Sequence, residues 1–402
     1  MPTVAGILLA GVAATPAQAD SIRDRQWHLD AMRAEQMWKT STGKGITVAV
    51  IDSGVQDSIP DLRGQVVAGK DFSKHPGDEH TDYDGHGTGM AVLIAGTGGR
   101  GAADGSYGLA PGAKILPIRT PDFIEQSRTD GNPDDYPTYM AKAIRFAADS
   151  DAQVINISMG STAHSKELTK SVAYALSKGK LIFAAVGNTG DALDELEYPA
   201  ATPGVVGVGA IDRNVKATKE SQHGPQVDLV APGEGMVAAC LESETGVCET
   251  RGTSDATAIA SASAALIWSK HPGWTNNQVL RVMLNTAGKP QSGKERTDYL
   301  GYGAVRPRIA LTHPGDPGPA DKYPLADLEL TAAGSNSLTS KASESTGTGA
   351  PAKHDGSASA ASAHTEGGTS WVAVGISGLL LLGAAITVAA VARRRRPGPG
   401  VV

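Results

Sequence analysis

The stretch Gly252-Thr253-Ser254-Asp255-Ala256-Thr257-Ala258, which continues through small and aliphatic residues to Ile267, decides the fold. Small residues repeated over this length indicate a helix packed closely on all sides, because short side chains let neighbouring elements approach. Ser254 comes at the start of that helix, where unpaired N–H groups and a partial positive charge favour a developing oxyanion. The stretch thus has two interpretations: Ser254 is a nucleophile, or it caps an ordinary buried helix.

Outward from this helix, the chain alternates apolar strands with helices. Apolar runs that indicate buried strands occur at 45–52, 114–118, 154–160, 181–186, 205–210 and 227–233, and helices are expected at 91–96, 138–148, 166–178 and 276–286. Strands that alternate with helices at this spacing imply a parallel sheet with helices on both faces. The sequence therefore predicts an α/β fold with three layers and a mostly parallel central sheet.

The composition of the chain bounds its function. At 402 residues it can hold one large or two ordinary domains plus appendages. Its formal net charge of -6 gives no reason to expect nucleic acid as a partner. Aromatic residues make up 4% of the chain and glycine is abundant, which suits tightly packed α/β layers.

The two ends of the chain predict its compartment. Residues 1–19 are expected to be a signal peptide, because an apolar run is followed by the small-x-small pattern Ala17-Gln18-Ala19. Residues 371–392 are predicted to form a transmembrane helix, since Trp371 adjoins 21 uncharged apolar residues. Four arginines open the basic tail 393–402, which the positive-inside rule places in the cytoplasm. We therefore expect a single-pass protein of the cell membrane with its main domain outside; a buried soluble helix is the alternative.

Residues 20–312 are predicted to form the main domain, with a short lead-in before residue 45. Residues 313–370 are rich in Pro, Gly, Ser and Ala and have few large apolar side chains, so they are expected to be an extended linker. Outside the cytoplasm, Cys240 and Cys248 are expected to pair in a disulfide, although two unpaired thiols are the alternative.

Four polar residues flanked by glycine come at the ends of predicted strands or the starts of predicted helices: Asp52, His86, Asn188 and Ser254. A Ser–His–Asp hydrolase needs a hydroxyl, an imidazole that accepts its proton and a buried carboxylate that orients the imidazole. An Asn side chain together with the Ser254 N–H would donate to the oxyanion. Each of these residues alone is more often a loop, cap or turn residue, so the constellation carries the inference.

The motifs around these residues resemble the four signature motifs of the subtilisin superfamily of serine proteases. They are Val50-Ile51-Asp52-Ser53-Gly54, Gly85-His86-Gly87-Thr88, Gly187-Asn188 and Gly252-Thr253-Ser254, within residues 45–312. The resemblance implies a subtilisin-like fold in which Asp52 orients, His86 is general base and acid, Ser254 attacks through an acyl-enzyme, and Asn188 stabilises the oxyanion.

The predicted signal peptide, linker, membrane helix and Arg-rich tail resemble those of the mycosins, membrane-anchored proteases associated with type VII secretion. The resemblance implies a serine endopeptidase that cleaves exported proteins, with protein or peptide substrates and a type VII secretion complex as partners. The alternative is a membrane-anchored scaffold that stabilises such a complex, with proteolysis secondary.

The resemblance also implies where a substrate binds. Ser158-Met159-Gly160 would form one edge of the cleft, to which a peptide adds as a β-strand. Ala184 and Ala185 would line the pocket for the residue before the cut, and Glu197 could form its base and favour a basic side chain. A solvated loop carboxylate is the alternative for Glu197. Family members often bind structural calcium, but no Asp/Asn cluster here names ligands, so we expect no cofactor and assign no metal site.

Three residues depart from the family pattern. Gly89 stands where a second histidine is common, and Ala258 stands where a proline usually follows the serine. Asp255 directly follows Ser254, and a carboxylate there would oppose the oxyanion if it pointed inward. We expect Asp255 to point away or to bind a neighbouring backbone group.

Overall fold

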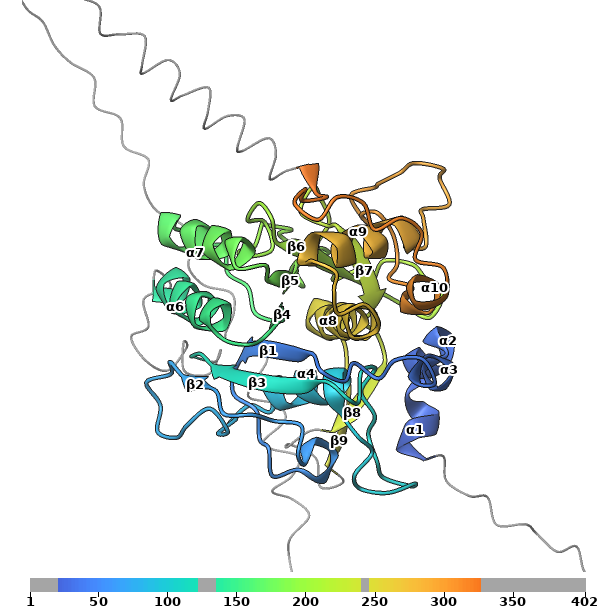
Figure 1. Ribbon diagram of the computed structural model, residues 1–402. Helices are drawn as coiled ribbons and strands as arrows, with labels where there is room; N and C mark the ends of the chain where they lie inside the picture. Colours follow the sequence, from blue (N-terminus) through green and yellow to red (C-terminus); the bar gives the residue numbers. More distant parts are fainter. Residues whose placement is uncertain (1–20, 122–134, 240–245, 327–402) are drawn as a thin grey trace, which may run out of the picture. The chain divides into compact units, whose positions relative to one another are not determined.

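The computed structural model describes residues 21–121, 135–239 and 246–326 (Figure 1). The predicted signal peptide, transmembrane helix and basic tail, residues 327–370 of the predicted linker, and Cys240 lie outside the described residues. Within the described ranges, no helix is long and apolar enough to cross a membrane.

A seven-stranded sheet forms the centre of the domain, in the order β2-β3-β1-β4-β5-β6-β7. Its strands are β1 (Thr47–Asp52), β2 (Lys70–Asp71), β3 (Lys114–Arg119), β4 (Val154–Ile157), β5 (Leu181–Ala185), β6 (Val206–Ile211) and β7 (Leu229–Pro232). Every neighbouring pair is parallel, with Val48 opposite both Ile115 and Val154. The α/β fold with a central parallel sheet is confirmed.

The two faces of the sheet carry separate hydrophobic cores. In β1, Val48 and Val50 belong to one core while Ala49 and Ile51 belong to the other, as the two-residue period of a strand requires. The first core includes α4 (His86–Ala95), α8 (Thr253–Lys270) and α9 (Asn276–Thr286); the second includes α6 (Tyr136–Asp149) and α7 (Lys166–Ser177). Figure 1 shows the two groups of helices on opposite sides of the sheet.

The central helix α8 is buried along almost its whole length. Fifteen of its residues, from Thr253 to Trp268, are buried, and it contacts β1, β4, β5, β6 and β7 as well as α4 and α10 (Pro307–Thr312). Its small side chains allow this close approach on all sides, which is the packing that the sequence predicts.

The lead-in forms three short helices, α1 (Ile22–Arg25), α2 (Trp27–Met32) and α3 (Ala34–Trp38). The buried side chain of Gln26, between α1 and α2, donates to the carbonyl oxygens of Tyr107 and Val237 at 2.8 and 3.1 Å. The Trp27 indole donates to the carbonyls of Glu234 and Gly235, each at 3.0 Å. The lead-in is therefore an integral part of the domain.

Three features differ from the sequence expectation. The strand expected at 154–160 ends at Ile157, and the next residues, Ser158 to Gly160, have no regular secondary structure. An antiparallel hairpin of β8 (Met236–Ala239) and β9 (Val247–Thr250), which carries Cys248, was not predicted. Each of these strands has only four residues, and a pattern this short was not recognised in the sequence. A short 3-10 helix, η1 (Pro60–Leu62), was likewise not predicted.

Candidate active site

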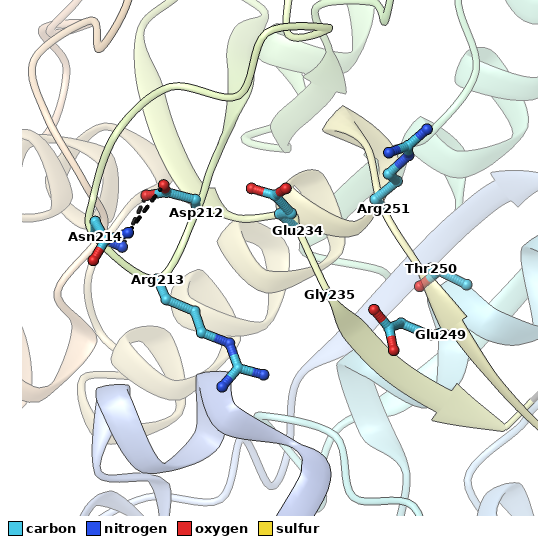
Figure 2. A pocket seen from close by; sticks show the side chains of 8 residues that line it. All are labelled: Asp212, Arg213, Asn214, Glu234, Gly235, Glu249, Thr250 and Arg251. Atoms are coloured by element: carbon cyan, nitrogen blue, oxygen red, sulfur yellow. Dashed lines mark hydrogen bonds between the residues drawn. The ribbon is translucent and has the colours of Figure 1, made fainter.

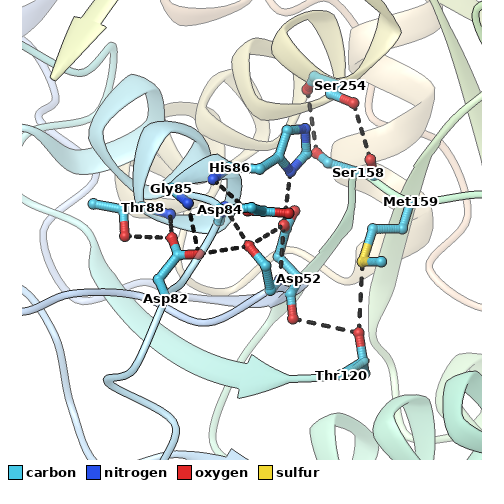
Figure 3. A network of polar contacts seen from close by, with 12 residues as sticks. Asp52, Asp82, Asp84, Gly85, His86, Thr88, Thr120, Ser158, Met159 and Ser254 are labelled. Atoms are coloured by element: carbon cyan, nitrogen blue, oxygen red, sulfur yellow. Dashed lines mark hydrogen bonds and ion pairs between the residues drawn. The ribbon is translucent and has the colours of Figure 1, made fainter. Parts of the chain in front are cut away.

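Asp52 and His86 meet at the carboxyl end of the sheet (Figure 3). Asp52 is the last residue of β1 and is 1% exposed, and His86 is the first residue of α4. His86 Nδ1 lies 2.7 Å from Asp52 Oδ1. Gly85 caps the helix with a φ of 78°, a conformation that a residue with a Cβ resists, and so turns the chain sharply into His86.

A second buried carboxylate, Asp82, holds this corner together. Its Oδ1 accepts hydrogen bonds from the Gly85 N–H and the Ser53 hydroxyl, and its Oδ2 accepts from the N–H and the hydroxyl of Thr88. The Ser53 hydroxyl also lies 3.2 Å from Asp52 Oδ1. Asp82 was not identified from the sequence, because a capping side chain is expected directly before the helix and Asp82 lies four residues before His86.

The charge of Asp52 governs the protonation of His86. Burial disfavours the imidazolium, but the charge and hydrogen bond of Asp52 outweigh it, with additional attraction from Asp84 and Asp255, and raise the pKa of His86 to about 9. The second Asp52 oxygen, Oδ2, is buried and has no hydrogen-bond partner in the described part of the chain. The Asp52 carboxylate therefore depends on His86 for its countercharge.

Ser254 lies in the first turn of α8, after Gly252, whose φ of 139° sets the turn into the helix. Its hydroxyl donates to the Ser158 carbonyl oxygen at 2.9 Å, and the Ser158 hydroxyl donates to the Ser254 carbonyl at 3.2 Å (Figure 3). Among the described residues, the acceptor of the Ser254 hydroxyl is thus Ser158 rather than His86. A protonated imidazole has a hydrogen on both nitrogens and cannot accept that proton.

Asn188 lies beside Ser254 in the same cleft, which His86 also lines. The Asn188 side-chain oxygen accepts hydrogen bonds from the N–H and the hydroxyl of Thr253, at 2.9 and 3.1 Å. These bonds decide which end of the Asn188 amide is the oxygen, so the NH₂ group is the end that can donate into the cleft. A side-chain donor next to the helix N-terminus is the arrangement that stabilises an oxyanion.

Glu197 lines the same cleft, with its carboxylate between Gly160 and Gly187. Gly160, Ala185, Gly187 and Glu197 all line the cleft, and a Cβ on Gly160 would lie 2.3 Å from Glu197 Oε2. Burial raises the pKa of Glu197, whose Oε1 accepts a 2.9 Å hydrogen bond from Gln222.

The other residues predicted for substrate binding lie deeper. Met159 is 3% exposed, with its carbonyl bonded to the Tyr136 hydroxyl at 3.0 Å and its sulfur 3.5 Å from the Thr120 hydroxyl. Ala184 is fully buried in β5. Both lie beneath the cleft, while Ser158, Gly160 and Ala185 reach it.

The three departures from the family pattern lie around Ser254 and His86. Asp255 is 2% exposed and accepts a 2.7 Å hydrogen bond from the Thr250 hydroxyl on β9. It is among the residues that line the cleft, and the Thr250 side chain is a partner that the sequence did not predict. Ala258 is fully buried in α8, and Gly89 lines the cleft one helical turn from His86.

A second hollow adjoins this cleft, because Thr250 and Arg251 line both (Figure 2). Its other lining residues are Asp212, Arg213, Asn214, Glu234, Gly235 and Glu249. Asp212 is engaged with its own loop, accepting from the Asn214 and Lys216 N–H groups. The Arg213 guanidinium lies 5.3 Å from the Trp27 ring. Within the described residues, no group of three or more His, Cys, Asp or Glu side chains is arranged to hold a metal ion.

Comparison with known proteins gives the family. Residues 43–305 match the subtilase family, Peptidase_S8. Mycosin-1 of Mycobacterium tuberculosis is 32% identical over 366 residues, which cover 79% of this chain and 80% of that protein. Thermitase of Thermoactinomyces vulgaris is 32% identical over 265 residues, which cover 66% and 89% respectively.

A solved structure is similar as well. The serine protease MycP1, described as an essential component of the type VII (ESX-1) secretion system, has a TM-score of 0.62 at 33% identity, covering 74% of this chain and 90% of MycP1. The family match spans more than half of the chain, and mycosin-1 aligns with most of it. The chain therefore belongs to the subtilase family and is a mycosin-like serine endopeptidase.

Proposed function

We propose that Ser254, His86 and Asp52 form the catalytic triad, with Asn188 as oxyanion donor. The observation that carries this proposal is the 2.7 Å contact between His86 Nδ1 and Asp52 in a cleft that Ser254 and Asn188 also line. Asp52 holds His86 with Nδ1 toward the carboxylate, which leaves Nε2 to accept the Ser254 proton once His86 is neutral.

In the reaction, Ser254 Oγ leaves the Ser158 carbonyl and transfers its proton to His86 Nε2 while it attacks the scissile carbonyl. The Asn188 amide and the Ser254 N–H donate to the resulting oxyanion. His86 then gives the proton to the leaving amine, and water, deprotonated by the same imidazole, hydrolyses the acyl-enzyme.

Covalent labelling tests the triad. A fluorophosphonate probe should label the wild-type protein and should not label Ser254→Ala. Ser263→Ala is a matched control, because Ser263 lies on the same helix and is fully buried, with its hydroxyl bonded to the Ile259 carbonyl. Equal labelling of wild type and Ser254→Ala would reject Ser254 as the nucleophile.

The substrates are proposed to be exported proteins with a basic residue before the scissile bond. The supporting feature is the Glu197 carboxylate in the pocket between Gly160 and Gly187. Cleavage profiling of a peptide library should show a preference for Arg or Lys before the cut, and Glu197→Gln should abolish it. An unchanged profile in Glu197→Gln would leave Glu197 as a structural loop residue.

The setting is proposed to be the outer side of the cell membrane, in association with a type VII secretion complex. Residues 1–19 would be a signal peptide, 20–312 the peptidase domain, 313–370 a linker, 371–392 the membrane helix and 393–402 the cytoplasmic tail. Similarity to MycP1 and the hydropathy of 372–392 support this organisation. The Cys240–Cys248 disulfide belongs to the same proposal. External protease should degrade the domain in intact cells, and truncation before residue 371 should release it from the membrane.

A scaffold role for the same protein is the second candidate, supported by the MycP1 description as a component of a secretion system. Secretion retained in a Ser254→Ala strain but lost in a deletion strain would favour it. Loss of secretion in both strains would make proteolysis the required function.

A further inference from the structure

The part of the cleft that receives the chain after the cut follows from the position of the Glu197 pocket. This inference rests on the proposed function. If the side chain before the cut enters the pocket between Gly160 and Gly187, the chain after the cut must pass the start of α8. Thr250 and Asp255 line the cleft there, together with Gly89 of α4.

Asp255 is the charged group in this part of the cleft. It directly follows Ser254, is 2% exposed, and is fixed by the 2.7 Å hydrogen bond from the Thr250 hydroxyl to its Oδ1. Gly89 lies one turn after His86 on α4 and lines the same space without a side chain.

The Asp255 carboxylate has no fixed countercharge. In the described ranges, no Lys or Arg lies within ion-pair distance of it, and the neighbouring Arg251 is 74% exposed and pairs with Glu220 at 3.7 Å. A buried carboxylate without a cation is costly, so a cation supplied by a ligand is favoured there. Burial raises the pKa of Asp255 to about 6, so the group is ionised at neutral and alkaline pH.

The titratable groups that interact with Asp255 make its charge most effective in the reactive state. His86, from α4, attracts the carboxylate while it is protonated. Asp52, from β1, and Asp84, before α4, also attract the imidazolium. Because the triad reacts from the state in which His86 is neutral, the Asp255 charge has no imidazolium beside it when the substrate binds to that state, and the imidazolium forms only as Ser254 attacks.

We propose that Asp255 is a specificity-determining residue that selects a basic side chain in the residue immediately after the scissile bond. The guanidinium or ammonium group supplies the countercharge, and the aliphatic stem packs beside Met90, which lines the same part of the cleft. Together with Glu197, Asp255 makes the enzyme selective for a pair of basic residues that flank the cut.

Two peptides that differ only in the charge of the residue after the cut test this proposal. The two share a basic residue before the cut and carry Arg or its neutral isostere citrulline after it. At pH 8 the ratio of kcat/KM for Arg over citrulline should be about 10 or more in the wild type. It should fall to about 1 in Asp255→Asn, and Asp255→Glu should restore part of it. Glu197→Gln is the control, which should change the preference before the cut and leave this ratio unchanged.

The ratio of kcat/KM for the two peptides also distinguishes a direct effect of Asp255 on specificity from an indirect effect through His86. Protonation of His86 slows both peptides equally and cancels in the ratio, so the wild-type ratio should fall only as pH falls through about 6. A wild-type ratio near 1 at pH 8 would overturn the proposal. The proposal would also be overturned if Asp255→Asn shifted the pH profile for both peptides but kept the wild-type ratio of kcat/KM.

The pH series on wild type tests the proposal even where Asp255→Asn does not fold. Fluorophosphonate labelling separates the two levels of inference. If Ser254 is labelled but the ratio stays near 1, the specificity proposal alone fails. If Ser254 is not labelled, the proposed catalytic function fails.

Discussion

The negative charges around the cleft act together on the His86 side chain. Asp52 holds its imidazole at 2.7 Å, and the negative charge of Asp84 and Asp255 adds to that of Asp52. The resulting pKa of about 9 means that the resting enzyme at neutral pH holds His86 protonated and the Ser254 hydroxyl bonded to Ser158. Catalysis therefore needs the deprotonated minority of molecules.

Activity should rise with pH through the pKa of His86. The base form is required, so kcat/KM should increase about tenfold per pH unit below pH 9 and level off above it. Measurement with one peptide between pH 6 and 10 gives the midpoint. A midpoint near 6.5 would show that Asp52 does not hold the imidazolium as the geometry indicates.

Asp52→Asn should lower both the rate and that midpoint. The amide removes the negative charge and offers the wrong hydrogen-bonding partner to Nδ1, so kcat should fall by about 10³ to 10⁴. The midpoint should move to lower pH because the attraction that raises the pKa of His86 is lost. Loss of rate without a shift in midpoint would contradict the electrostatic part of this account.

Asp82→Asn should loosen the corner that holds His86. All four groups bonded to the Asp82 oxygens are donors, and an amide NH₂ cannot accept from two of them. The free energy of unfolding should fall by about 1 to 3 kcal/mol, with a parallel loss in kcat. Thermal denaturation and kinetics measure the two effects, and Asp78→Asn, an exposed carboxylate on the same loop, is the control.

Among the elements, the turn into α8 links the proposed oxyanion donor, Asn188, to the proposed nucleophile, Ser254. Gly252 has a φ of 139°, and a Cβ there would lie 3.2 Å from Asn188 Oδ1. The same Asn188 oxygen is bonded to the Thr253 N–H at 2.9 Å. The start of α8 and the loop after β5 therefore position one another.

Gly252→Ala should disturb this turn and displace Asn188. We expect kcat to fall by about 10- to 100-fold with a smaller change in KM, because the oxyanion contact forms only in the transition state. Gly273→Ala is the control, since Gly273 has no positive φ and a Cβ there meets nothing within 4 Å. In a double-mutant cycle, Gly252→Ala should add little to Asn188→Ala; full additivity would count against the coupling.

Much of the element order could be predicted from the sequence. Continuous apolar runs indicated the strands and a run of small residues indicated the central helix, and glycine-flanked motifs gave Asp52, His86, Asn188 and Ser254 as candidate site residues. The hairpin β8–β9 and the role of Asp82 were missed, because short strands carry little pattern and a capping aspartate looks like any loop carboxylate. The contact of Asp255 with Thr250 was not predicted, since it depends on the hairpin.

At the scale of the whole molecule, His28 in α2 makes the domain sensitive to acid. Its side chain is fully buried, and neither ring nitrogen has a hydrogen-bond partner among the described residues. Burial, with a contribution from Arg23, lowers the pKa of His28 to about 3. Between about pH 6.5 and 3 the unfolded chain therefore binds a proton that the folded domain does not.

The free energy of unfolding should fall with pH in that window. The contribution of His28 is a loss of about 1.4 kcal/mol per pH unit as pH falls from about 6.5 to 3. Denaturant unfolding of wild type and His28→Leu at several pH values measures the slope of the free energy of unfolding against pH. This slope should be smaller in the variant. His313→Leu, at an exposed histidine, should leave the slope unchanged. Equal slopes for wild type and His28→Leu would refute the prediction.

The partners of the lead-in lie far along the chain, and this has a consequence for the order of folding. Gln26 bonds to the Val237 carbonyl, 211 residues later, and the Ser41 hydroxyl bonds to the Leu266 carbonyl, 225 residues later. The lead-in is made before these partners, and the two bonds cannot form until β8 and α8, respectively, have been synthesised. The lead-in is thus fixed late, and an incomplete chain leaves Trp27 and Trp38 more exposed. Such distant pairing slows folding, and refolding should end with burial of these two indoles, visible as a late change in tryptophan fluorescence.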